Sequence, residues 1–287
     1  MIVTPIDERT GLYFEEAGGE QAPSIVFLHG GGIAGWMWRH QVEFFKDRYH
    51  CLVPDLPEQG QSAAVGPFSV ESAADLIAEL ILSRAHGGKA HVVGLSEGAQ
   101  IVVSLLSRHP EVIDHAVSSS AILRPMPMQK ILYSHNLFVM SYRWFVAPFK
   151  NNDWWIRLNM HSAAGVGDEF YTEFKRSFQE TTQSGFVNLM DSSLNFRLPE
   201  HLEKANVPVL VVAGKLEYSQ MIQSARDLLA VLPHAQGVLV SLGQGSSLAK
   251  EHNWAMTAPA LFNATVKAWI EDQPLPRELL PLTVELN

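Results

Sequence analysis

Short apolar runs alternate with segments of helical periodicity between residues 24 and 121. Runs of about four to eight apolar residues are typical of buried strands, whereas apolar residues spaced three or four apart indicate an amphipathic helix. The expected strands are residues 24–28, 50–56, 91–95 and 115–119, and the expected helices are residues 70–83 and 100–107. This alternation predicts an α/β fold with a mostly parallel central sheet that helices cover on both faces.

The same alternation returns in the last third of the chain. Strands are expected at residues 208–213 and 237–242, and helices at residues 219–232 and 259–270. Residues 1–20 predict an antiparallel hairpin with Gly11 near its turn. A chain of 287 residues therefore fits one core domain that carries an inserted subdomain.

The alternation stops between residues 122 and 200, where the chain is helix-like and holds more than half of its aromatic residues. An insertion between two sheet strands predicts a helical lid over the carboxyl edge of the sheet, where open α/β sheets bind ligands. The expected organisation is a core part over residues 1–121, a lid over residues 122–200 and a second core part over residues 201–287.

Three tryptophans of the expected lid, Trp144, Trp154 and Trp155, are candidates for binding substrate. Because Trp154 and Trp155 are neighbours in the sequence, only one of the two is expected to face the site. The alternative, in which the aromatic residues only pack the lid onto the core, stays open.

Composition and charge narrow the class of partner. Hydrophobic residues make up 47% and charged residues 18% of the chain, as in an ordinary globular enzyme. A formal net charge of −9 argues against nucleic acid or an anionic membrane as the main partner. With Cys51 as the single cysteine, no signal peptide and no long apolar stretch, we expect a cytoplasmic protein without membrane insertion. Its expected partner is a small molecule, and the sequence leaves its oligomeric state open.

A nucleophile motif follows the expected strand at 91–95. Residues 94–98 read Gly-Leu-Ser-Glu-Gly and match G-x-S-x-G between a strand and a helix. The central residue of this motif sits on a sharp, strained turn, so its neighbours two positions away must be small. The motif makes Ser96 the candidate nucleophile, with an ordinary helix-capping serine as the alternative.

A glycine-rich loop follows the first expected strand, where residues 29–32 read His-Gly-Gly-Gly. Glycines let the backbone approach a substrate and aim N–H groups at it, so this loop is expected to supply half of an oxyanion hole. Gly31 is favoured over Gly32 as the donor, and the N–H of Glu97 is expected to supply the other half. A flexible turn is the alternative, and the loop is not a G-x-G-x-x-G dinucleotide motif.

In this order of motifs, residues 20–272 resemble an α/β-hydrolase with an inserted helical lid. Residues 55–62 resemble that family's D-x-x-G-x-G-x-S segment with Glu58 in place of its first glycine. The His-Asn-Trp at 252–254 resembles its C-terminal histidine segment. The resemblance implies a catalytic triad in the order serine, acid, histidine, and it implies no cofactor and no metal.

Two residues complete the expected triad. His252 is the candidate general base because it follows the last sheet strand, whereas His234 lies in a turn at the opposite edge of the sheet. Glu217 is the candidate acid because it comes directly after the strand at 208–213, and many relatives have an aspartate there. Asp191 and Asp227 are the next carboxylates to test.

The expected activity is hydrolysis of carboxylic esters with small to medium, largely apolar groups through an acyl-enzyme on Ser96. Other chemistry on the same triad (C–C bond hydrolysis, lyase or perhydrolase reactions) and a hydrolase-like receptor are the alternatives.

The side chain of Glu97 poses a problem of charge. A carboxylate about 4 Å from a developing oxyanion opposes it by about 1 kcal/mol in water and about 4 kcal/mol at an effective dielectric constant of 20. Either this side chain points away and complements the helix dipole, or it lines the pocket and bonds to a donor from the lid or a loop.

Overall fold

An eight-stranded sheet forms the centre of the protein in the computed structural model, which describes residues 6–127 and 134–283. The strands are β1 (Phe14–Ala17), β2 (Ser24–Leu28), β3 (His50–Pro54), β4 (Ala90–Leu95), β5 (Ile113–Ser119), β6 (Val209–Gly214), β7 (Ala235–Val240) and β8 (Leu280–Pro281). Their spatial order is β1-β3-β2-β4-β5-β6-β7-β8. The six central strands are parallel, and β1 and β8 close the edges in antiparallel pairing. The predicted mostly parallel sheet is confirmed.

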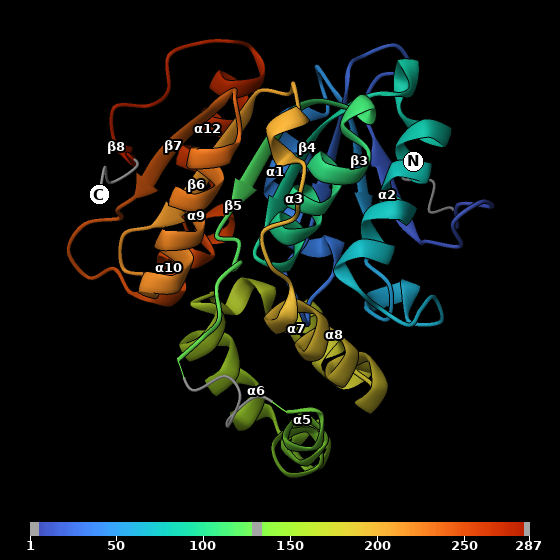
Figure 1. Ribbon diagram of the computed structural model, residues 1–287. Helices are drawn as coiled ribbons and strands as arrows, with labels where there is room; N and C mark the ends of the chain where they lie inside the picture. Colours follow the sequence, from blue (N-terminus) through green and yellow to red (C-terminus); the bar gives the residue numbers. More distant parts are fainter. Residues whose placement is uncertain (1–5, 128–133, 284–287) are drawn as a thin grey trace.

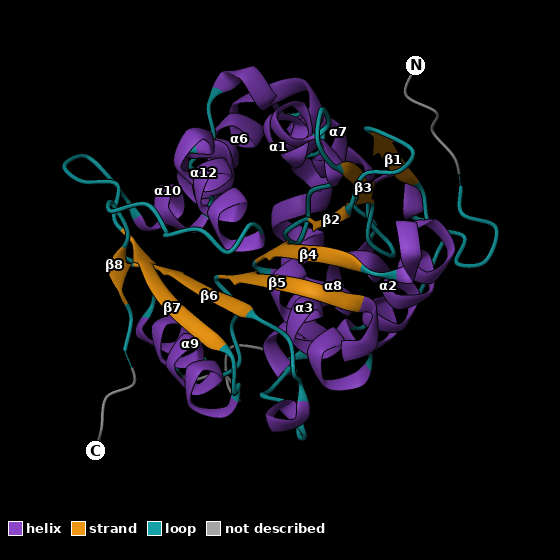
Figure 2. Cartoon of the chain, turned by 90° about the horizontal axis from the view of Figure 1, so that it is seen from above, coloured by secondary structure: helices purple, strands orange, loops and turns teal. Residues whose placement is uncertain are grey.

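Helices cover both faces of this sheet (Figure 2). The core helices are α1 (Arg39–Phe45), α2 (Val70–Arg84), α3 (Glu97–Arg108), α9 (Ser219–Val231) and α12 (Pro259–Ile270). On β2, Val26 and Leu28 pack into the core under α2 and α3, while Ile25 and Phe27 pack into the opposite core under α1 and α12. Burial on both faces explains why the strands have continuous apolar sequences rather than alternating ones.

A helical insertion, defined here as the described residues between β5 and β6, gathers at one end of the sheet (Figure 1). Its helices are α5 (His135–Ser141), α6 (Asp153–Asn159), α7 (Tyr171–Glu180) and α8 (Gln183–Asn195), with π-helical turns at Tyr142–Val146 and Met160–Ala164. Asn152 and Thr182 cap α6 and α8 by accepting backbone N–H bonds from Trp155 and Gly185. Its boundaries as a separate lid subdomain remain a prediction.

The N-terminal hairpin is reduced to a single antiparallel bridge between Ile6 and Tyr13. Gly11 lies in its turn at a φ of 72°, and the Asp7 carboxylate accepts a bond from Arg84 of α2 that fixes the turn to the core. The following strand, β1, pairs with β3 instead, because β3 offers an open sheet edge. Residues 1–5 of the predicted hairpin lie outside the described residues. None of the described helices has both the length and the apolar character that crossing a bilayer requires.

Candidate active site

The turn between β4 and α3 holds Ser96 in a strained left-handed conformation, with φ 57° and ψ −114°. A Cβ atom at Gly94 would lie 2.3 Å from the carbonyl oxygen of Gly98, and one at Gly98 would lie 2.2 Å from the carbonyl oxygen of Leu28. Neither position has room for a side chain. The close crossing of two backbones is therefore the physical reason for the glycines of the G-x-S-x-G motif.

The structure brings His252 and Glu217 together. His252 ends α10 (Leu248–His252), and its Nδ1 lies 2.6 Å from Oε1 of Glu217. The Glu217 side chain is fully buried, and its other oxygen accepts the N–H of Gly214 at 2.9 Å. A carboxylate bonded in this way holds the imidazole in one orientation and supports its protonated form.

Ser96 and His252 line the same cavity, whose volume is about 380 Å³. Within the described part of the chain, the Ser96 hydroxyl makes no hydrogen bond to His252. Catalytic hydrogen bonds of substrate-free enzymes are often long and tighten only when substrate binds. The two side chains therefore face one space, and a substrate in it would contact both.

Glu251 is a positioning residue that the sequence analysis missed. Its side chain is buried and accepts the N–H of Leu216 at 2.8 Å and that of Leu242 at 3.1 Å. These bonds join the loop that carries Glu217 to the loop that follows β7. Only its position next to His252 could have drawn attention to it, because no motif includes this carboxylate.

The other residues considered for the acid and the base of the triad lie in different surroundings. Asp227 is paired with Arg124 at 2.6 Å, and Asp191 with His135 at 2.7 Å. His234 is exposed in the turn before β7. Of the carboxylates considered from the sequence, Glu217 is the one that contacts His252.

The glycine loop after β2 lies beside the nucleophile, since a Cβ atom at Gly30 would lie 3.6 Å from that of Ser96. His29 anchors this loop. It is fully buried, its Nδ1 lies 2.8 Å from the Gly30 carbonyl oxygen, and its Nε2 accepts the N–H of Leu56. Burial lowers the pKa of His29, which suits the neutral ring that these two bonds require.

The two candidate donors in this loop differ in their hydrogen bonds. Gly32 donates its N–H to Oε1 of Gln59 at 2.7 Å, so this N–H is already engaged. The arrangement favours Gly31 over Gly32 as an oxyanion donor, and the roles of Gly31 and Glu97 as the two donors stay predictions.

The Glu97 side chain is buried and bonded to the loop after β3 and to α8 of the insertion. Its Oε1 accepts a bond from Nε2 of Gln59 at 2.6 Å, and its Oε2 lies 3.4 Å from the hydroxyl of Ser193 on α8. A Cβ atom at Gly31 would lie 2.9 Å from the same Oε2. Glu97 therefore makes the bonds expected in the second arrangement, but it is not among the described residues that line the cavity beside Ser96.

Burial also answers the question of charge. It raises the pKa of Glu97 to about 8, so this carboxyl group is mostly protonated at pH 7. The bonds from Gln59 and Ser193 lower the pKa by less than burial raises it. A neutral Glu97 does not oppose an oxyanion bound at its own backbone N–H.

Glu58 occupies the position where the family motif has its first glycine, and it adopts a φ of 59°. This left-handed conformation is easiest for glycine and costs free energy for other residues. The Glu58 carboxylate accepts the N–H of Phe68 at 2.9 Å and a bond from the Asn188 side chain at 2.8 Å. Because Asn188 lies on α8, Glu58 joins this loop to the insertion.

The cavity wall corrects the expectation for the tryptophans. Trp144 and Trp154 are each 68% exposed, and Trp155 stacks on Phe149 while donating its indole N–H to the Phe145 carbonyl. None of the three predicted tryptophans is among the residues that line the cavity.

Phenylalanines from α7 and α8 take that place: Phe174, Phe178 and Phe186. Phe174 and Phe178 are four residues apart and therefore lie on one face of α7. Helical spacing in α7 could have singled out this pair, whereas the neighbouring tryptophans have no such common face.

Comparisons with known proteins identify the family and the fold. A family model described as alpha/beta hydrolase fold matches residues 23–241. The chain is 30% identical over 279 residues to an AB hydrolase superfamily protein of Gibberella zeae, covering 95% of this chain and 88% of the relative. It is 25% identical to a pimeloyl-(acyl-carrier protein) methyl ester esterase of Vibrio atlanticus, covering 78% and 87% of the two chains. The crystal structure of the enol-lactonase from Burkholderia xenovorans superimposes with a TM-score of 0.72 at 18% identity, covering 93% of this chain and 100% of the other, which shows a shared fold.

We expect Glu97→Gln, which keeps the shape of a neutral carboxyl group, to change the pH dependence of stability. Between the ordinary pKa of 4.5 and the raised pKa of about 8, the folded protein holds a proton that the unfolded chain has released. The wild type therefore loses stability as pH rises through this window, and the variant lacks that loss. Urea unfolding at pH values from about 5 to about 8 should show the free energy of unfolding of the variant gaining on that of the wild type.

The same variant tests whether the ionised Glu97 side chain affects turnover or has no effect on it. If ionised Glu97 opposes the oxyanion, kcat of the wild type should fall above about pH 8 and kcat of Glu97→Gln should not. Parallel pH profiles, together with kcat/KM within about twofold across a substrate panel, would show that the Glu97 side chain has no functional role.

Proposed function

Because this chain belongs to the α/β-hydrolase family, we propose that it is a serine hydrolase that cleaves carboxylic esters through an acyl-enzyme on Ser96. The observation that carries the proposal is the 2.6 Å contact of His252 with Glu217, at a cavity that His252 shares with Ser96. The methyl ester esterase among its relatives supports esters as the substrate class.

The reaction has two halves. His252 accepts the proton of the Ser96 hydroxyl through Nε2, and the serine oxygen attacks the ester carbonyl carbon. The oxyanion is bound by the N–H groups of Gly31 and Glu97. When the intermediate collapses, the C–O bond to the alcohol breaks and His252 gives its proton to the leaving oxygen. Water then attacks the acyl-enzyme with His252 again as the base, which releases the acid and restores Ser96.

Glu217 supports both halves from behind the imidazole. Its bond to Nδ1 fixes the tautomer that leaves Nε2 free to accept a proton, and its charge stabilises the imidazolium. The cycle uses only residues of this chain.

The shape of the site favours apolar substrates. The wall that faces Ser96 includes Val146, Phe174 and Phe178 of the insertion. A smaller pocket of about 160 Å³ shares Gly31, Gly32 and Phe186 with it and is also lined by Leu189 and Met190. We propose that the acyl and alcohol groups of the ester divide between these two spaces, which suits small to medium groups.

The same triad supports C–C bond hydrolysis, lyase or perhydrolase reactions, and a receptor could retain it. Turnover of short p-nitrophenyl esters separates an esterase from a receptor, because a receptor would be acylated once without turnover. A panel that adds β-diketones and peracid formation separates the esterase from the other triad reactions.

Ser96→Ala should reduce kcat by at least about 10³-fold, and the double variant with His252→Ala should lose little more, because triad residues act as a unit. An organophosphonate should modify Ser96 in the wild type, as peptide mass spectrometry would show. Modification of another serine with Ser96 left free would contradict the assignment.

Glu217→Gln should lower kcat roughly 10²- to 10⁴-fold while leaving KM nearly unchanged, since it removes charge and keeps shape. Asp227→Asn is a matched control, because Asp227 is paired with Arg124 rather than with the histidine. Near-normal activity of Glu217→Gln would assign the acid to another residue.

Phe178→Ala should lower kcat/KM about tenfold for esters with aryl or long acyl groups, because it removes an apolar wall. Trp154→Ala is the control from the same insertion, and its exposed side chain predicts little change. Equal losses in the two variants, or preferred hydrolysis of charged dicarboxylate monoesters, would contradict an apolar site formed by α7.

A further inference from the structure

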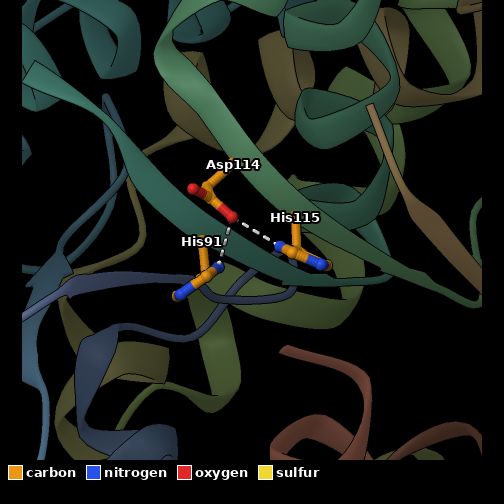
Figure 3. A group of neighbouring side chains, drawn as sticks. All are labelled: His91, Asp114 and His115. Carbon is orange, nitrogen blue, oxygen red and sulfur yellow. Dashed lines mark hydrogen bonds and ion pairs between the residues drawn. The ribbon is translucent and has the colours of Figure 1, made fainter. Parts of the chain in front are cut away.

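His91, Asp114 and His115 lie together at the end of the sheet opposite to Ser96. His91 is the second residue of β4, whereas Ser96 follows the last, so the two are separated by about 16 Å along the strand. One metal-ligating atom of each of the three side chains lies within 4.8 Å of the others. Figure 3 shows the Asp114 carboxylate between the two imidazole rings, with contacts to both.

An irregularity in the pairing of β4 with β5 produces this cluster. Ala90 pairs with Ile113 and Val92 pairs with Ala116, so His91 alone stands opposite two residues, Asp114 and His115. In a regular strand, consecutive side chains point to opposite faces. The extra residue breaks that alternation and lets both side chains approach His91. Bulges are rare in parallel pairs and often re-aim a side chain at a functional position.

The ligand types and their surroundings suit a metal ion. Asp114 Oδ1 is hydrogen-bonded to Nδ1 of His115 at 2.5 Å, a bond whose proton a metal ion would replace, and it lies 3.5 Å from Nδ1 of His91. On the far side of its ring, Nε2 of His115 lies 3.6 Å from the Asp272 carboxylate. This distance is longer than a hydrogen bond, and Nε2 of His115 has no hydrogen-bond partner in the described part of the chain, so Asp272 is placed to become the outer carboxylate partner of a metal-bound His115. Two imidazoles and one carboxylate form a common ligand set of zinc and its neighbours in the first transition row.

His91 offers an available nitrogen. The residue is 8% exposed, and in the described part of the chain its Nδ1 has no hydrogen-bond partner. A buried polar atom without a partner is costly, and metal coordination would satisfy it.

We propose that His91, Asp114 and His115 bind a divalent transition metal of the Zn²⁺ or Co²⁺ type, at a site separate from the esterase centre. The ion joins the beginning of β4 to the beginning of β5, and Asp272 becomes the outer partner of His115 when the ion binds. Because the three side chains come together only in the folded chain, binding stabilises the fold. No motif in the sequence marks this site, since its residues depend on the strand pairing.

The metal-stripped 287-residue chain should be titrated with Co²⁺, whose visible absorption reports nitrogen and oxygen coordination, and with Zn²⁺ in thermal unfolding. We expect one equivalent of Co²⁺ to bind, and Zn²⁺ at a hundredfold excess over its Kd to raise Tm by about 5 °C. Ser96→Ala should bind the metal as the wild type does, which separates this proposal from the proposed hydrolase activity.

Variants locate the ion. His91→Gln and His115→Gln should each weaken binding at least about tenfold, and Asp272→Asn should weaken it about tenfold by removing the outer partner. His109→Gln is the matched control, because His109 lies outside this cluster, 2.7 Å from Asp75 and 3.8 Å from Glu111. If His91→Gln does not fold, the more exposed Asp114→Asn replaces it. The proposal is overturned if wild-type protein binds neither ion at about 100 µM, or if the double variant of His91 and His115 binds as tightly as wild type.

Discussion

Two backbone segments cross at van der Waals distance beside Ser96, and the rest of the active site is built around that contact. Gly98 packs against the carbonyl of Leu28, so the glycine loop that follows β2 must begin next to the nucleophile. The left-handed turn at Ser96 costs about 1–3 kcal/mol. Its backbone N–H bonds to the Ser119 carbonyl at 2.8 Å, which holds the turn against β5. The strain is therefore held by the same sheet that positions the serine oxygen.

Burial, rather than distance from Ser96, removes the negative charge of Glu97, because burial raises the pKa of its carboxyl group. If the Glu97 backbone N–H binds the oxyanion, as proposed, its carboxyl group must lie in the same region. The side-chain amide of Gln59 accepts the N–H of Gly32 and donates to Glu97. These two bonds join the turn at Ser96 to the glycine loop. One turn further along α3, Gln100 donates to the Ser193 carbonyl at 2.8 Å, next to the contact that Ser193 makes with Glu97. The bonds that hold α8 beside the turn at Ser96 thus come from α3, the helix that follows Ser96.

Patterns of neighbouring residues in the sequence predicted the features that depend on neighbouring residues, such as strands and the turns at their ends. The strand predicted at 24–28 is β2, and Ser96, Glu217 and His252 were identified because each follows a strand end. Strand ends shifted by a residue or two, as in β7, which begins at Ala235 rather than residue 237. The parts that were missed depend on contacts between distant segments: the cavity face of α7, the loops joined by Glu251, and the pairing that sets His91 opposite two residues.

A parallel sheet buried on both faces leaves only its two ends for polar chemistry. At the carboxyl end the strands lead into loops, so side chains from three strands meet and a cavity opens beside Ser96. At the amino end the strands begin in close pairing, and two imidazoles with a carboxylate would ordinarily point to different faces. The extra residue in β5 removes that obstacle at one position only. The proposed active site therefore depends on where the strands end, whereas the proposed metal site depends on the irregular pairing of β4 with β5.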